Sequence, residues 1–215
     1  MSIRKWIDAA VRRLYQLSSL GMRKRWTFSR YAMYAQIEEF SFKLPNRSGR
    51  VLSISHSSVL LDAMAIKADE YVEANYPDEN ILRLSFPDHS FDWVISDQVL
   101  EHIVGCPQKA MTETIRVLKP GGQLLHTTCF MTPHHGATDG SLEDFWRFSP
   151  QGLAYLCREA SSTYAQGSGH PIANLLSSFG LAFEPVPVAS WHPIQRILRM
   201  KSPGHASLVW VYAQK

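Results

Sequence analysis

The chain has 215 residues, three cysteines and a formal net charge of +3. This length suits one domain with a full hydrophobic core, and so small a charge gives no argument for nucleic-acid binding. Cys106, Cys129 and Cys157 lie far apart and form no CxxC pair, so we expect no disulfide framework and a reducing cytoplasm. No apolar run approaches the ~18 residues of a membrane span. Arg12 and Arg13 interrupt the N-terminal apolar stretch too early for a signal peptide.

Residues 1–20 are predicted to form an amphipathic helix, because apolar residues recur at spacings of three and four. Basic residues lie off this stripe, and residues 23–26 (RKRW) add a basic cluster. Residues 1–26 could therefore contact an anionic membrane surface peripherally. The alternative is a helix that packs on its own domain and covers the substrate cleft. The apolar stripe consists of Ile3, Trp6, Ile7, Ala10, Val11, Leu14 and Leu17.

A second helix is predicted over residues 29–42, followed by a turn at residues 45–49. We place the boundary there, with an N-terminal helical arm at residues 1–48 and a second domain at residues 49–215. In that domain strand and helix patterns alternate. The predicted strands are residues 50–55, 69–73, 91–96, 123–128, 181–186 and 207–213, and the predicted helices are residues 59–67, 107–117 and one starting at Pro150.

This alternation predicts an α/β fold, with a doubly wound, mostly parallel sheet covered by helices on both faces. Two strings in this part are specific: residues 84–92 (LSFPDHSFD) with 99–102 (VLEH), and residues 116–122 (RVLKPGG). They resemble the middle of class I S-adenosylmethionine (SAM)-dependent methyltransferases of the type 11 kind. The resemblance covers roughly residues 29–215. It implies a Rossmann-like, seven-stranded sheet and SAM as the cofactor.

The resemblance also implies which residues hold the cofactor. Glu73 ends the second strand, where a carboxylate can accept hydrogen bonds from both ribose hydroxyls. Asn80 would pair with the adenine amino group, with Ile81 beside the ring. Asp97 and Gln98 would line the methionine end, and His102 would lie one helical turn further on. Glu73 could instead be an exposed strand end, Asn80 a turn residue, and His102 a structural residue.

One departure from the family pattern concerns the first loop. Residues 53–58 read SISHSS, without the glycines that let a backbone approach the cofactor at positive φ. Ser55 and Ser57 could still donate hydrogen bonds to the cofactor. The second interpretation is a catalytically inactive relative that serves as a binding or scaffold protein.

Polar residues after the fifth predicted strand suggest an acceptor site. His134 or His135 could accept a proton, Asp144 could orient it, and Arg147 could hold an anionic group. The alternative is a loop of solvated histidines with a structural Trp-Arg corner. We predict no metal site, because His126, His134, His135 and Asp144 lack a recognised ligand spacing.

The string at residues 144–150 (DFWRFSP) resembles methyltransferases associated with surface-polysaccharide gene sets. We therefore predict an enzyme that transfers methyl from SAM to a small or carbohydrate-type acceptor, with oxygen as the accepting atom, in surface polysaccharide biosynthesis. It would be cytoplasmic or membrane-peripheral, with no nucleic-acid partner. A dehydrogenase is disfavoured because the chain lacks GxGxxG.

Overall fold

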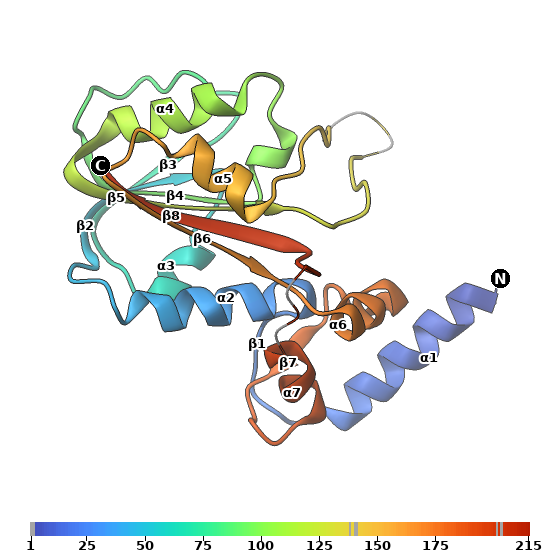
Figure 1. Cartoon of the computed structure of the whole chain (residues 1–215). Helices are drawn as coiled ribbons and strands as arrows, with labels where there is room; N and C mark the ends of the chain where they lie inside the picture. The colour runs from blue at the N-terminus through green and yellow to red at the C-terminus, as the bar shows by residue number, and fades with distance from the viewer. Residues whose placement is uncertain (1–2, 138, 140–141, 201, 203) are drawn as a thin grey trace. The chain divides into compact units, whose positions relative to one another are not determined.

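The computed structural model describes residues 3–137, 139, 142–200, 202 and 204–215. The chain forms two compact units (Figure 1). One combines residues 1–36 with 168–207, and the other combines residues 37–167 with 208–215. The first unit therefore joins the N-terminal segment to a late segment that the sequence analysis assigned to the second domain. The boundary after residue 48 stays a prediction.

The second unit contains a six-stranded sheet with the order β3-β2-β4-β5-β8-β6. The neighbours from β3 to β5 pair in parallel, and β8 lies antiparallel to β5. The predicted mostly parallel α/β sheet is confirmed, with six strands among the described residues where seven were expected. The strands are β2 (Ser48–Ile54), β3 (Lys67–Ala74), β4 (Phe91–Asp97), β5 (Leu118–Cys129), β6 (Ser162–Ser168) and β8 (Leu208–Gln214).

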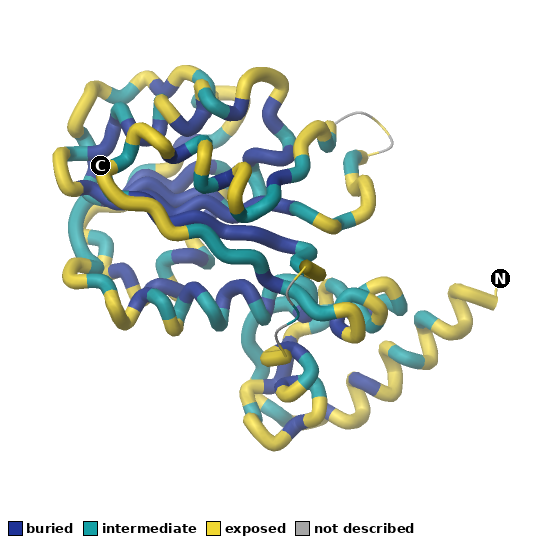
Figure 2. The backbone as a smooth tube through the Cα atoms, in the orientation of Figure 1, coloured by how far each residue is buried: buried dark blue, intermediate teal, exposed yellow. Residues whose placement is uncertain are grey.

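Helices cover both faces of this sheet, with α4 and α5 on one side and α3 and the C-terminal end of α2 on the other (Figure 1). The central strands are the most deeply buried part of the unit (Figure 2). On the α4 side, Leu52, Val94 and Leu124 pack in one cluster with Met111 and Leu153 of the two helices. The helices are α2 (Phe28–Ser41), α3 (Val59–Met64), η1 (Leu100–His102), α4 (Pro107–Val117) and α5 (Pro150–Leu156).

Arg116, near the end of α4, explains why two separated strings of the sequence belong together. Its guanidinium donates to the carbonyl oxygens of Leu84 (3.0 Å) and Phe86 (2.9 Å) and to the carboxylates of Asp88 (2.7 Å) and Glu113 (2.9 Å). These partners raise the pKa of Arg116 further above its usual range, the Glu113 hydrogen bond being the largest cause. The loop before β4 is thereby fixed to the helix that precedes β5.

The first unit is built from α1 (Ile3–Ser18), the N-terminal part of α2, a small sheet and three further helical segments. In the small sheet β1 (Lys24–Thr27) pairs antiparallel with β7 (Pro185–Pro187). The expected strand at residues 181–186 is wrong in its bounds: Leu181 ends a helical segment, and Gly180 before it has φ 88°. The helical segments are α6 (Pro171–Leu176), η2 (Ser177–Leu181) and α7 (Pro193–Arg199).

Helix α1 packs on the first unit through one narrow face. Tyr15 is buried and donates its hydroxyl hydrogen to the Pro185 carbonyl (2.7 Å), and Arg12 donates to the Gly180 carbonyl (3.2 Å). Most of the predicted apolar stripe instead faces outward. None of the described helices has the length and apolarity to cross a membrane. The large exposed residues of this stripe are Ile3, Trp6, Ile7, Leu14 and Leu17.

Candidate functional site

The loop after β2 adopts a glycine-type path without glycine. Ser55 and His56 have φ of 54° and 56°, in the left-handed region that side chains disfavour. Ser57 is fully buried and anchors the loop. Its amide donates to Ser53 Oγ (3.1 Å), and its Oγ donates to the Ile54 carbonyl and accepts from the Asp97 amide (2.7 Å). The strained conformation is therefore fixed by buried hydrogen bonds between the ends of β2 and β4.

Glu73 lies beside this loop, at the end of β3. Its carboxylate accepts hydrogen bonds from the Tyr71 hydroxyl (2.5 Å) and Asn75 Nδ2 (2.9 Å), and His56 Nδ1 lies 2.9 Å away. The Tyr71 hydrogen bond is the largest cause that lowers the pKa of Glu73 below its usual value. Asn75 also accepts from the His56 amide (3.2 Å). Glu73 is thus an ionised, oriented carboxylate at the glycine-free loop.

Asp97 and Gln98 occupy the end of β4. Asp97 Oδ1 accepts from Thr127 Oγ1 of β5 (2.6 Å). Gln98 has φ 57°, and its amide N–H donates to the same Thr127 oxygen (3.1 Å). With its side-chain amide turned, Gln98 donates to Glu101 Oε1 (3.1 Å) and accepts from the Thr128 amide (3.2 Å). These bonds hold both side chains at the carboxyl edge of the sheet.

Asn80 and Ile81 have local structural partners. Asn80 Oδ1 accepts from the Leu82 amide (2.9 Å), as in an Asx turn, and Asn80 forms an isolated bridge with Arg83. Ile81 is 6% exposed and belongs to the core cluster. The proposed contacts of both residues with adenine stay predictions.

A partly buried ion pair holds the described part of the loop after β5. Arg147 donates to Asp144 Oδ1 (2.5 Å) and Oδ2 (2.6 Å), and Asp144 Oδ2 also accepts from the His135 amide (2.8 Å). The Arg147 hydrogen bond lowers the pKa of Asp144 well below its usual value. Arg147 further donates to the carbonyls of Thr132 and Pro133. The structure therefore brings Asp144, Arg147 and His135 together, and His134 is an exposed residue next to them in the sequence. The predicted roles of these residues toward an acceptor stay predictions.

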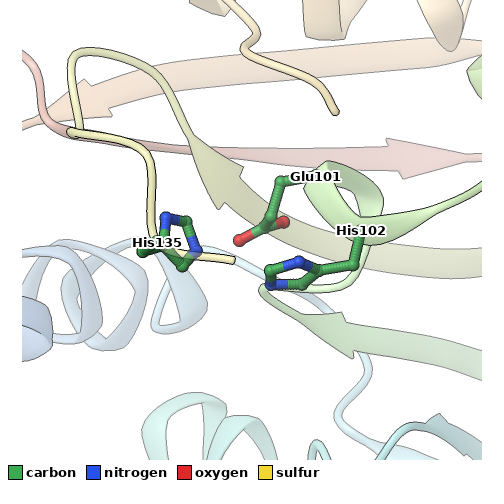
Figure 3. Close-up of side chains that lie close together, drawn as sticks. All are labelled: Glu101, His102 and His135. Carbon is green, nitrogen blue, oxygen red and sulfur yellow. The ribbon is translucent and has the colours of Figure 1, made fainter. Parts of the chain in front are cut away.

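A second group joins this loop to η1. Glu101 is fully buried, and its Oε2 accepts from Thr128 Oγ1 (2.8 Å). The side chains of Glu101, His102 and His135 point toward one another (Figure 3). The rings of His102 and His135 meet edge to face, with centroids 5.2 Å apart. Sequence reasoning selected both histidines but missed Glu101, although it lies in the VLEH string.

His126 lies away from these groups. It is fully buried, and its ring contacts Ser96 Oγ of β4 and Thr114 Oγ1 of α4 (3.2 Å). Burial lowers the pKa of His126 to about 3, so the imidazole is neutral. His126 is therefore a structural residue of the core and not part of the polar loop that follows β5.

Comparison with known proteins identifies the central part of the chain. Residues 38–126 match the sequence model of a family described as a methyltransferase domain. No curated protein sequence matches the chain significantly.

Solved structures with the same fold are distant in sequence. A SAM-dependent methyltransferase from Mesorhizobium loti has a TM-score of 0.53 at 13% identity, covering 87% of this chain and all of that one. A methyltransferase from Haloferax volcanii, solved with the Trm112 methyltransferase activator, has a TM-score of 0.52 at 14% identity, covering 97% and 96%. Phosphoethanolamine N-methyltransferase 2 of Haemonchus contortus, in complex with phosphomonomethylethanolamine and S-adenosylhomocysteine, has a TM-score of 0.54 at 13% identity, covering 97% of this chain and 57% of that one.

The structural matches establish the fold, and the family match covers residues 38–126 of it. The first quoted strings, residues 84–92 and 99–102, lie inside the matched segment, as does the loop after β2. Residues 38–126 therefore match the methyltransferase-domain family, and the chain shares its fold with solved methyltransferases.

Proposed function

We propose that the chain binds SAM at the carboxyl ends of β2, β3 and β4 and transfers its methyl group to a small or carbohydrate-type acceptor. The observation that carries this proposal is the convergence of three strand ends: His56 contacts Glu73, and Ser57 contacts Asp97. Ligands of open parallel α/β sheets bind at this edge.

In this proposal the residues at each strand end bind a different part of the cofactor. Glu73 accepts the ribose hydroxyls, for which the exposed His56 ring has to move aside, and Asn80 and Ile81 flank the adenine. Ser55 and Ser57 provide the loop beneath the cofactor. Toward the methionine end lie Asp97, Gln98 and His102.

The reaction needs positioning more than acid–base help. The acceptor oxygen attacks the sulfonium methyl, the S–CH3 bond breaks as the O–CH3 bond forms, and S-adenosylhomocysteine leaves. The hydroxyl proton passes to solvent or to His134 or His135. Asp144 and Arg147 hold the loop that carries these histidines. We assign the acceptor to surface-polysaccharide sugars because of the DFWRFSP string. A substrate screen should compare sugar hydroxyl acceptors with amine acceptors, in which nitrogen takes the methyl group.

A non-catalytic binding or scaffold protein is the second candidate. Two observations favour it: the loop after β2 has no glycine, and Glu73 already has Tyr71, Asn75 and His56 as partners. A protein of this kind would keep the fold without turning over SAM.

Calorimetric titration of S-adenosylhomocysteine into the full chain separates these candidates. Glu73→Ala should weaken binding at least about tenfold, ~1.4 kcal/mol, because charge-assisted hydrogen bonds are lost. Glu70→Ala is the matched control, an exposed glutamate on the same strand that pairs with Arg50. Equal affinity of Glu73→Ala and the unaltered chain would remove Glu73 from the site.

We also propose that α1 contacts the cytoplasmic face of a membrane peripherally. Its exposed apolar stripe lies on the same helix as Arg4, Lys5 and Arg13, which can bind anionic headgroups. The full chain should co-sediment with anionic vesicles and less with neutral ones. A Trp6→Gln/Leu14→Gln variant should co-sediment less with anionic vesicles than the unaltered chain does. Equal sedimentation of the variant and the unaltered chain would refute this contact.

A further inference from the structure

Glu101, His102 and His135 place three metal-ligating groups around one point. One carboxylate oxygen and one nitrogen of each imidazole lie within 4.8 Å of one another (Figure 3). Ligand atoms that are ~2.1 Å from a shared ion are themselves roughly 3–4 Å apart, so small side-chain rotations close the set. These three described residues form no direct hydrogen bond or ion pair with one another. Their ligand atoms are therefore not already occupied by bonds within the group.

Glu101 has the environment of a carboxylate that lacks a cation. It is fully buried, Thr128 and Cys129 donate to its two oxygens, and the turned amide of Gln98 donates to Oε1 as well. Within the described parts of the chain it forms no salt bridge with a lysine or arginine. A buried carboxylate without a counterion is costly, and a bound cation would offset that cost.

The two imidazoles are oriented as metal-binding histidines usually are. His102 Nδ1 lies 2.5 Å from the Glu143 carbonyl oxygen, and His135 Nδ1 lies 3.3 Å from Asp144 Oδ2. Metal-bound histidines typically donate their second ring N–H to a carbonyl or carboxylate, which fixes the ring. These acceptors leave the other nitrogen of each ring available to an ion.

We propose that Glu101, His102 and His135 bind a divalent transition-metal ion of the Zn2+, Co2+, Mn2+ or Fe2+ type. Two imidazoles and one carboxylate suit these ions better than Mg2+ or Ca2+, which prefer oxygen ligands throughout. Three protein ligands leave positions for water or for an acceptor hydroxyl, whose proton is lost more readily on a metal. This role in methyl transfer rests on the proposed function, whereas the metal binding does not.

The test is a titration of the full chain with Co2+ after removal of metals by chelation. The visible absorption of bound Co2+ should saturate at one equivalent. His102→Ala and His135→Ala should each weaken binding at least about tenfold. His134→Ala, in the same loop but outside the three ligands, should bind as the unaltered chain does. Absence of saturable binding, or equal affinity of His135→Ala and the unaltered chain, would overturn the proposal.

Two further measurements keep the result interpretable. Circular dichroism of the metal-free variants checks folding; His135 lies on an exposed loop, so its variant should fold even if one at buried Glu101 does not. S-adenosylhomocysteine binding is measured on the same metal-free samples. Binding of Co2+ without binding of S-adenosylhomocysteine would support the metal site and refute the proposed function. Binding of S-adenosylhomocysteine without binding of Co2+ would refute the metal site and leave the proposed function standing.

Discussion

His126 should make the stability of the protein fall in mild acid. Its ring is fully buried between β4, β5 and α4, and burial lowers its pKa to about 3. In the unfolded chain a histidine titrates near 6.5. Between these two pKa values the unfolded state binds more protons, so the free energy of unfolding decreases as the pH falls.

The magnitude follows from the size of the shift. Each pH unit below about 6.5 removes roughly 1.4 kcal/mol, so His126 should cost about 2 kcal/mol between pH 7 and pH 5. In His126→Gln this loss disappears, because the amide keeps hydrogen-bonding capacity for Ser96 and Thr114 without titrating. The variant is less stable at pH 7, and its deficit should shrink by about 2 kcal/mol at pH 5.

Urea unfolding of both proteins at pH 7 and pH 5 measures this double difference. His205→Gln, at an exposed histidine, is the control for general effects of removing an imidazole. A deficit of His126→Gln that stays constant between the two pH values would refute the assignment of His126 as a buried neutral residue.

Two other variants test local structure. Gly49→Ala should destabilise the protein by on the order of 2–3 kcal/mol in urea, because Gly49 has φ 125° and a Cβ there would lie 2.6 Å from Asp92 Cβ; wild-type stability would contradict this packing. Asp144→Asn should cost about 1–2 kcal/mol, because Arg147 loses its carboxylate but stays partly exposed to solvent. Limited proteolysis should then cut the loop between Met131 and Arg147 faster, and unchanged cleavage would show that the ion pair does not hold the loop.

Much of the second unit could be predicted because local signals agree with tertiary contacts. The string at residues 84–92 and Arg116 form one hydrogen-bonded unit, so tertiary contacts join two separated parts of the sequence pattern. The predicted start of α5 is confirmed, since Ser149 Oγ accepts from the Gly152 amide (3.0 Å) with Pro150 in the first turn.

Strand β6 was missed for a different physical reason. Strand β6 (Ser162–Ser168) lies at the edge of the sheet and reads STYAQGS, with its first three residues exposed. An edge strand can be polar on much of its surface, so it lacks the apolar run that marks buried strands. The apolar pattern favours a strand at residues 181–186 instead. In the structure a helical segment ends at Leu181, just after Gly180, and the strand β7 begins only at Pro185 and is three residues long.

The site was only partly predictable, because its geometry depends on distant partners. Sequence gave no sign that Ser55 and His56 take positive φ, since Ser57 enforces this through Asp97, which is far along the chain. Likewise Glu101 follows two apolar residues in the VLEH string, and nothing in the sequence indicates that it is buried. Only the fold brings it to His135 in the loop after β5.

The central claim is that the glycine-free loop still holds the cofactor, and thermal unfolding with S-adenosylhomocysteine tests it most directly. A ligand at a hundred times its dissociation constant adds about 2.7 kcal/mol to the stability. In a chain of this length that should raise the midpoint by roughly 5–10 °C. Such a rise, reduced in Glu73→Ala but not in Glu70→Ala, is the predicted result. An unchanged midpoint up to millimolar ligand would contradict the claim and favour the non-catalytic protein.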